Sequence, residues 1–142
     1  MTSHSRPPRI GDLFAVRTPS AADIFGRVVS TSAIVGPIHD CQLVYLYRPG
    51  SRRTLADLLT APMLTSRAPW SRRYFEIVGS EPLLPGDFLE GHGFRDRAGA
   101  LYDEESRPIG RAPEPIGEWR LHEDVASIEA AIREGLALDP RA

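Results

Sequence analysis

The chain has 142 residues, 42% of them hydrophobic and 25% charged, with a formal net charge of −2 at pH 7. This length suits one domain with its own core, and this composition excludes a wholly disordered chain. Thirteen prolines and twelve glycines favour short strands and turns over long helices.

The sequence also indicates a compartment. Cys41 is the only cysteine, so no internal disulfide forms, which fits a reducing environment. The first residues lack the apolar run of a secretory signal, and no stretch approaches the roughly 20 apolar residues that span a membrane. We therefore expect a cytoplasmic protein without a membrane partner.

Charge is distributed unevenly along the chain. Residues 41–75 hold six arginines against one acidic residue, whereas residues 76–142 hold seven arginines against fifteen acidic residues. Such asymmetry orients a charged partner and speeds its encounter with the protein.

Apolar patterns predict the strands of the first half. Residues 1–9 offer nothing to pack and are expected to form a flexible tail. Short apolar runs predict strands near 12–16 and over 24–30, and Gly36-Pro37 marks a turn. Residues 43–47 are apolar on both faces, which predicts a central strand.

The next elements are shorter. Thr54 is a suitable cap for a short central helix that Pro62 ends. Residues 74–78 predict a strand, and residues 94–103 predict a hairpin. Residues 108–117 are rich in proline and glycine, which predicts a connecting loop.

Residues 125–136 carry the clearest helical pattern. Apolar side chains recur there at helical spacing, acidic residues favour the helix start, and Pro140 ends it. Strands followed by one clear helix predict a single α+β domain over residues 10–142. Its sheet should be mostly antiparallel and strongly curved, with a small open barrel as an alternative, and its last helix amphipathic.

One candidate for metal or nucleophilic chemistry is the pair His39 and Cys41. The two side chains lie on one side of a predicted strand, where they could offer two zinc ligands. A structural zinc site needs four ligands, and the sequence has no second pair of this kind. A nucleophile and its base usually come from distant parts of a sequence. We therefore expect a structural role for this pair, with no metal and no cofactor.

The best polar cluster consists of Asp87, Glu90 and His92, with Asp96 nearby. Two carboxylates and a histidine could bind a divalent cation or move a proton, and the neighbouring glycines would let a substrate approach. Acidic residues beside glycine are also common in solvated turns. A small enzyme at this loop is therefore an alternative, while the expected protein has no catalytic residues.

The first candidate partner surface is acidic. Asp103, Glu104 and Glu105 form the densest acidic run of the second half, at a predicted hairpin end. Such a surface would suit a basic partner, for example the nucleic-acid cleft of a nuclease, because complementary charges accelerate association.

The second candidate surface is basic and aromatic. It consists of Arg52, Arg53 and Arg72 with Trp70, and it would suit an acidic protein face. As an alternative, a protein-interaction or RNA-associated adaptor would use these groups for phosphate contacts and base stacking. The sequence pI near 6.1 is wrong for a dedicated nucleic-acid binder, so a protein partner is expected.

The chain contains, in order, the motifs Gly11–Val16, Phe25–Val28, Leu43–Tyr47, Tyr74–Gly79 and Pro82-Leu83. Together with the predicted hairpin and C-terminal helix, these motifs resemble the immunity protein 26 family over roughly residues 10–138. They are short and degenerate. The stretch 31–41 and the arginine-rich turn 48–53 depart from the family pattern.

The resemblance implies an antitoxin of a bacterial polymorphic toxin system. Such a protein binds a cognate toxin domain in the cytoplasm of the producing cell and blocks it without chemistry of its own. The family supplies no catalytic residues to carry over. Its motif positions Gly11, Asp12, Phe14, Gly26 and Gly79 are expected to serve the fold.

Overall fold

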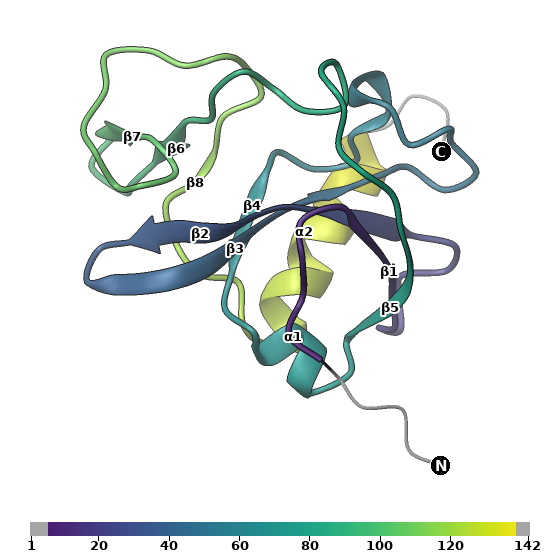
Figure 1. The fold of residues 1–142 in the computed structure, drawn as a ribbon. Helices are drawn as coiled ribbons and strands as arrows, with labels where there is room; N and C mark the ends of the chain where they lie inside the picture. Colours follow the sequence, from purple (N-terminus) through teal and green to yellow (C-terminus); the bar gives the residue numbers. More distant parts are fainter. Residues whose placement is uncertain (1–5, 139–142) are drawn as a thin grey trace.

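The structure, a computed structural model, describes residues 6–138 (Figure 1). Strands precede one long helix, so the α+β class predicted from the sequence is confirmed. The strands are β1 (Asp12–Val16), β2 (Phe25–Val35), β3 (Ile38–Leu46), β4 (Met63–Thr65), β5 (Phe75–Ser80), β6 (Phe94–Arg95), β7 (Leu101–Tyr102) and β8 (Gly117–Glu118). The helices are the 3-10 turn η1 (Leu55–Asp57), the short α1 (Ala68–Ser71) and the long α2 (Val125–Leu138).

An antiparallel sheet in the order β4-β3-β2-β1-β5 forms the centre of the domain. β2 and β3 make a long hairpin, which turns at Gly36 with φ +59° as Gly36-Pro37 predicts. The stretch 31–41, which departs from the family pattern, forms the end of this hairpin. β4 and β5 are not paired with each other in the described part of the chain, so the sheet stays open.

β3 is buried on both faces, as its apolar pattern predicts. Val44 and Leu46 face one way and pack in a cluster with Ile128 and Ile132 of α2. Tyr45 faces the other way and belongs to a second cluster, beneath β6 and the loops around it. β3 lies between β2 and the edge strand β4, so it is an inner strand of the sheet. The middle strand of the five is β2.

α2 covers the first face of the sheet, because its apolar side chains recur at helical spacing. Ile128 and Ile132 are fully buried, and Leu136 packs beside them. Asp124 caps the helix start, where its Oδ1 accepts a hydrogen bond from the backbone N–H of Ser127 at 2.8 Å.

A second sheet of three strands, in the order β7-β6-β8, lies over the other face (Figure 1). β6 and β7 form the hairpin predicted within 94–103. Asp96 holds its turn, since Oδ1 accepts hydrogen bonds from the backbone N–H groups of Ala98 and Ala100, each at 2.9 Å. β8 joins β6 in parallel, so the loop expected over 108–117 ends in a strand.

Residues 6–9, expected within the flexible tail, are held against β1. Arg6 donates through both terminal nitrogens to the two carboxylate oxygens of Asp12, each at 2.9 Å. The backbone N–H of Arg9 donates to Asp12 Oδ2 at 2.8 Å. Asp12 is fully buried, so these bonds compensate a carboxylate inside the domain. Residues 1–5 of the expected tail lie outside the described residues.

The predicted central helix is only the 3-10 turn η1. Asp57 Oδ2 accepts hydrogen bonds from the backbone N–H and the hydroxyl of Thr54, at 3.0 and 2.9 Å, which closes the turn. The chain then leaves the helical path, because the N–H of Leu59 donates to the carbonyl of Leu46 at 2.8 Å. Pairing with the end of β3 replaces further helical bonds.

Four of the five motif positions behind the family resemblance serve the fold, whereas a Cβ at the fifth, Gly79, would make only an ordinary contact, 3.8 Å from Leu13. Asp12 and Phe14 are fully buried. A Cβ at Gly26 would lie 2.3 Å from the Phe14 ring, and a Cβ at Gly11 would lie 2.3 Å from the Glu81 carbonyl oxygen. Gly11 also has φ +91°, a conformation that favours glycine.

Candidate functional site

The acidic run 103–105 follows β7 and is largely engaged within its own loop. Asp103 Oδ1 accepts hydrogen bonds from the backbone N–H groups of Glu105 and Arg107, each at 2.9 Å. Arg107 also pairs with Asp103 Oδ2 at 3.1 Å and with Glu105 Oε1 at 2.5 Å. Although burial works in the opposite direction, the hydrogen bonds from Arg107 and Glu105 lower the pKa of Asp103.

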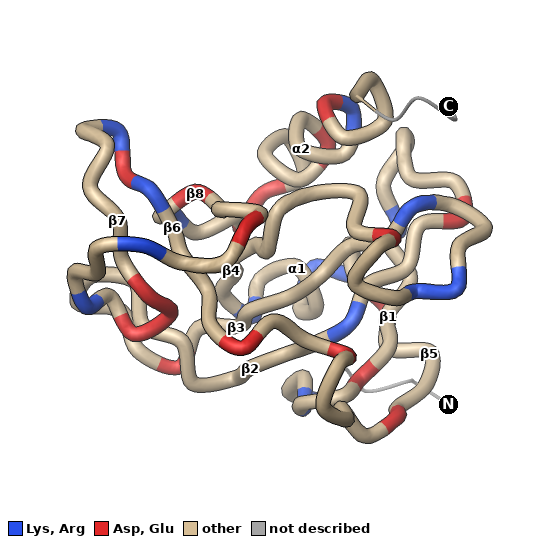
Figure 2. The backbone as a smooth tube through the Cα atoms, turned by 90° about the horizontal axis from the view of Figure 1, so that it is seen from above, with Lys and Arg blue, Asp and Glu red and all other residues tan. Residues whose placement is uncertain are grey.

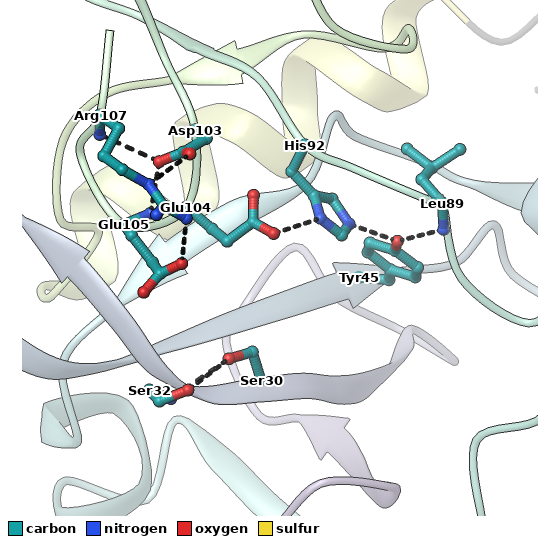
Figure 3. A network of polar contacts seen from close by, with 9 residues as sticks. All are labelled: Ser30, Ser32, Tyr45, Leu89, His92, Asp103, Glu104, Glu105 and Arg107. Carbon is teal, nitrogen blue, oxygen red and sulfur yellow. Dashed lines mark hydrogen bonds and ion pairs between the residues drawn. The ribbon is translucent and has the colours of Figure 1, made fainter. Parts of the chain in front are cut away.

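Glu104 points inward to a buried polar chain (Figure 3). Its Oε1 lies 3.8 Å from His92 Nδ1, and His92 Nε2 lies 2.7 Å from the Tyr45 hydroxyl. That hydroxyl accepts a hydrogen bond from the Leu89 N–H at 3.0 Å. The contact with His92 lowers the pKa of Glu104. The chain therefore ties the acidic loop to β3, and Glu104 contributes to the fold.

Charges of both signs meet at the β6–β7 end of the domain. Figure 2 shows basic and acidic positions alternating around these strands. Arg95 and Arg97 flank Asp96, and Arg107 pairs with two of the three acidic side chains of the 103–105 run. The acidic candidate surface predicted from the sequence, formed by Asp103, Glu104 and Glu105, is therefore not purely acidic.

The basic turn lies after β3. Arg52 and Arg53 are exposed, and the Arg53 guanidinium lies 5.9 Å above the ring of Phe25, in the range of a cation–π contact. Within residues 6–138, neither arginine has an acidic partner. A hollow of about 230 Å³ lies beside them, lined in part by Phe25 and Tyr47.

Trp70 and Arg72 do not join this turn in one surface. Trp70 lies in the core, where its ring meets Phe14 and Phe75 edge-on at centroid distances of 5.4 and 5.1 Å. Arg72 is exposed at the end of α1, at the bottom of Figure 1, whereas the turn after β3 is at the top. The expected aromatic partner of the arginine surface is therefore inaccessible.

The loop residues Asp87, Glu90 and His92 are engaged separately. Asp87 Oδ2 accepts a hydrogen bond from the backbone N–H of Leu84 at 2.9 Å and lies 3.8 Å from Arg27 Nη1. His92 is buried against Tyr45, as described above, and Glu90 is exposed. Each side chain therefore has its own surroundings, and the loop does not gather them around a common centre.

His39 and Cys41 do not share one side of β3. Asp40 has φ +57°, and this left-handed residue breaks the alternation of the strand. His39 is exposed and Cys41 is buried, and burial raises the pKa of the Cys41 thiol. Among residues 6–138, no three histidine, cysteine or acidic side chains are grouped so that they could hold a metal ion.

A groove of about 420 Å³ lies between α2, the segment 59–63 and β8. Two glycines allow these walls to approach. A Cβ at Gly135 would lie 2.5 Å from the carbonyl oxygen of Leu59, and a Cβ at Gly117 would lie 2.3 Å from that of Pro62. The segment between them is therefore held by close backbone contacts on both sides.

The groove has an apolar wall and a charged rim. Ile116, Ala131 and the exposed Leu138 contribute apolar surface. Glu118 and Glu134 also line the groove, and both side chains are exposed.

A hydrogen-bonded set of side chains fixes one end of the groove. Ser127 Oγ lies 2.6 Å from His122 Nδ1 and accepts a hydrogen bond from Arg120 Nη2 at 3.1 Å. Burial, reinforced by the charge of Arg120, lowers the pKa of His122 to about 4. His122 is thus neutral at pH 7, and its Nδ1 shares a hydrogen bond with the Ser127 hydroxyl. Glu118 Oε1, 3.9 Å from His122 Nε2, therefore has no charged partner there.

This groove was not predictable from any single motif of the sequence. Its walls come from the segment 59–63, from β8 and the residues beside it, and from α2, so no local motif marks it. One signal was present, because Gly135 interrupts an otherwise amphipathic helical pattern, and such a glycine often marks a close approach of another segment.

Comparisons with protein-family models, curated proteins and solved structures found no significant match. The resemblance to the immunity protein 26 family therefore rests on the short motifs alone. Within the described residues, no helix has both the length and the apolar character needed to cross a membrane.

Proposed function

We propose that the protein is an immunity protein, which binds a cognate toxin domain in the cytoplasm of the producing cell and neutralises it without chemistry of its own. The observation that supports a binding role is the groove beside α2. The groove is open to solvent, and the carboxylates of Glu118 and Glu134 line it. Within residues 6–138, neither carboxylate pairs with a charged basic side chain. The motif resemblance supplies the class of partner, and the groove supplies a surface for it.

The test is protection in a bacterial cell. A candidate toxin domain from a neighbouring gene is expressed from an inducible promoter, with and without the chain. We expect growth to be restored, and a purified, catalytically inactivated toxin domain to bind the chain in a stable complex. The core variant Leu46→Ala is a control for stability, because a less stable fold should protect the cell less well. Continued killing in the presence of the folded wild-type chain would refute the proposal.

A second candidate is an adaptor that uses the turn after β3. Arg52 and Arg53 favour it, because they are exposed and no acidic side chain of residues 6–138 pairs with them. Retention on immobilised RNA should then fall steeply with salt and should be lost in Arg52→Glu with Arg53→Glu. Retention that is equal in the variant and the wild type would exclude this role for the turn.

A further inference from the structure

Most carboxylates in the acidic second half have partners within the domain. Arg17 pairs with Glu76, Arg27 with Glu81 and Asp87, and Arg107 with Asp103 and Glu105. Among residues 6–138, the exposed acidic residues without a cationic partner are Asp23, Asp40, Glu90, Glu114, Glu118, Glu123, Asp124 and Glu134. Two of these eight, Glu118 and Glu134, line the same groove.

The other charged group of the groove does not neutralise this pair. Arg120 directs Nη2 to the Ser127 hydroxyl at 3.1 Å, and no carboxylate oxygen of the described residues lies within 4 Å of its guanidinium. Both carboxylates therefore remain available to a cation from outside. Next to them, Ile116, Ala131 and the exposed Leu138 offer a surface that suits methylene groups.

We propose that the groove binds an arginine or lysine side chain of the protein partner. The methylenes of that side chain lie against the apolar wall, and its cationic head pairs with Glu118 and Glu134. This inference rests on the proposed function for the identity of the partner, but the chemistry of the groove is independent of it. A partner of this kind is a toxin domain with a basic surface, whose charges the groove would cover.

The groove is tested first without a toxin. The ¹⁵N-labelled protein is titrated with N-acetyl-arginine amide, and with N-acetyl-norleucine amide as an uncharged probe of similar length. We expect the arginine probe to shift the amide signals of Gly117, Arg120 and Gly135, and the uncharged probe to shift them several-fold less. Shifts of equal size with both probes, or shifts outside the groove only, would overturn the inference.

Matched variants separate the groove from general acidity. Glu118→Gln with Glu134→Gln removes two charges in the groove, and Glu90→Gln with Glu114→Gln removes two exposed charges away from it. All four side chains are exposed, so both double variants should melt like the wild type. The groove variant should weaken binding of the arginine probe at least tenfold, and the control variant less than twofold. Equal weakening in both variants contradicts a specific site.

The same variants with the toxin domain distinguish this inference from the proposed function. If the wild type binds the toxin, the groove variant should bind it at least tenfold more weakly. If instead Arg52→Glu with Arg53→Glu abolishes binding while the groove variant binds like the wild type, the groove inference is wrong and the immunity function stands. If the wild type binds no toxin but the arginine probe binds the groove, the immunity function fails and the cation site stands.

Discussion

The buried imidazole beside the groove should make the stability of the domain depend on pH. His122 is 5% exposed, and its pKa falls from 6.5 to about 4, first because of burial and second because of Arg120. The unfolded chain therefore takes up a proton near pH 6.5, whereas the folded protein does not until about pH 4. Between these values, protonation favours the unfolded state, so stability present above pH 6.5 is lost as the pH falls.

The size of the effect follows from the shift. One pKa unit corresponds to about 1.4 kcal/mol, so the wild type should lose about 2 kcal/mol of unfolding free energy between pH 7 and pH 5 through this residue. Urea unfolding across this range measures the loss. His122→Asn is the matched control, because its amide group can share a hydrogen bond with the Ser127 hydroxyl but does not titrate. The variant should lack this part of the pH dependence.

A direct measurement completes the test. The Cε1–H signal of His122 should move little between pH 7 and pH 5 and should titrate with a midpoint near pH 4. A midpoint of His122 near 6.5, or an identical loss of stability in the wild type and His122→Asn, would refute the reasoning.

Three further changes test the packing. Leu46→Ala should lower the unfolding free energy by about 2–5 kcal/mol, because Leu46 is fully buried and leaves a cavity; chemical denaturation measures it, and a loss below about 0.5 kcal/mol would contradict the burial. Tyr45→Phe should lower the unfolding free energy by about 2 kcal/mol in the same assay, because His92 and the Leu89 N–H lose their hydrogen-bond partner. An unchanged unfolding midpoint would contradict a role for these buried hydrogen bonds. Gly135→Ala should lower the unfolding free energy by about 1–3 kcal/mol, because the new Cβ would meet the Leu59 carbonyl, although alanine usually stabilises a helix. A higher melting temperature would show that the walls of the groove separate easily.

Elements with strong periodicity were predictable from the sequence. The continuous apolar run of residues 43–47 reflects a strand buried on both faces, and the helical spacing from Val125 to Leu136 reflects a helix buried on one. The hairpin at β6 and β7 was also predictable. β4 and β8 were not, because strands of three and two residues show no period and exist only through pairing with β3 and β6.

The candidate surfaces were less predictable for a related reason. Sequence composition gives the charge of a segment but not the direction of its side chains. Trp70 lies among arginines in the chain, yet α1 turns it into the core against Phe14 and Phe75. Asp103 and Glu105 form an acidic run in the sequence, yet Arg107 folds back onto both of them. The groove depends on contacts between distant segments, which no local pattern contains.

The burial of β3 on both faces has a consequence for how the domain opens. The helix α2 protects one face of the strand, and the small sheet with its loops protects the other. If either cover detaches alone, the backbone amides of β3 stay hydrogen bonded to β2 and β4 and shielded from one side. In hydrogen exchange, the amides of β3 should therefore be replaced by deuterium last, at the rate of global unfolding, and amides of α2 and β6 should exchange earlier and independently of each other.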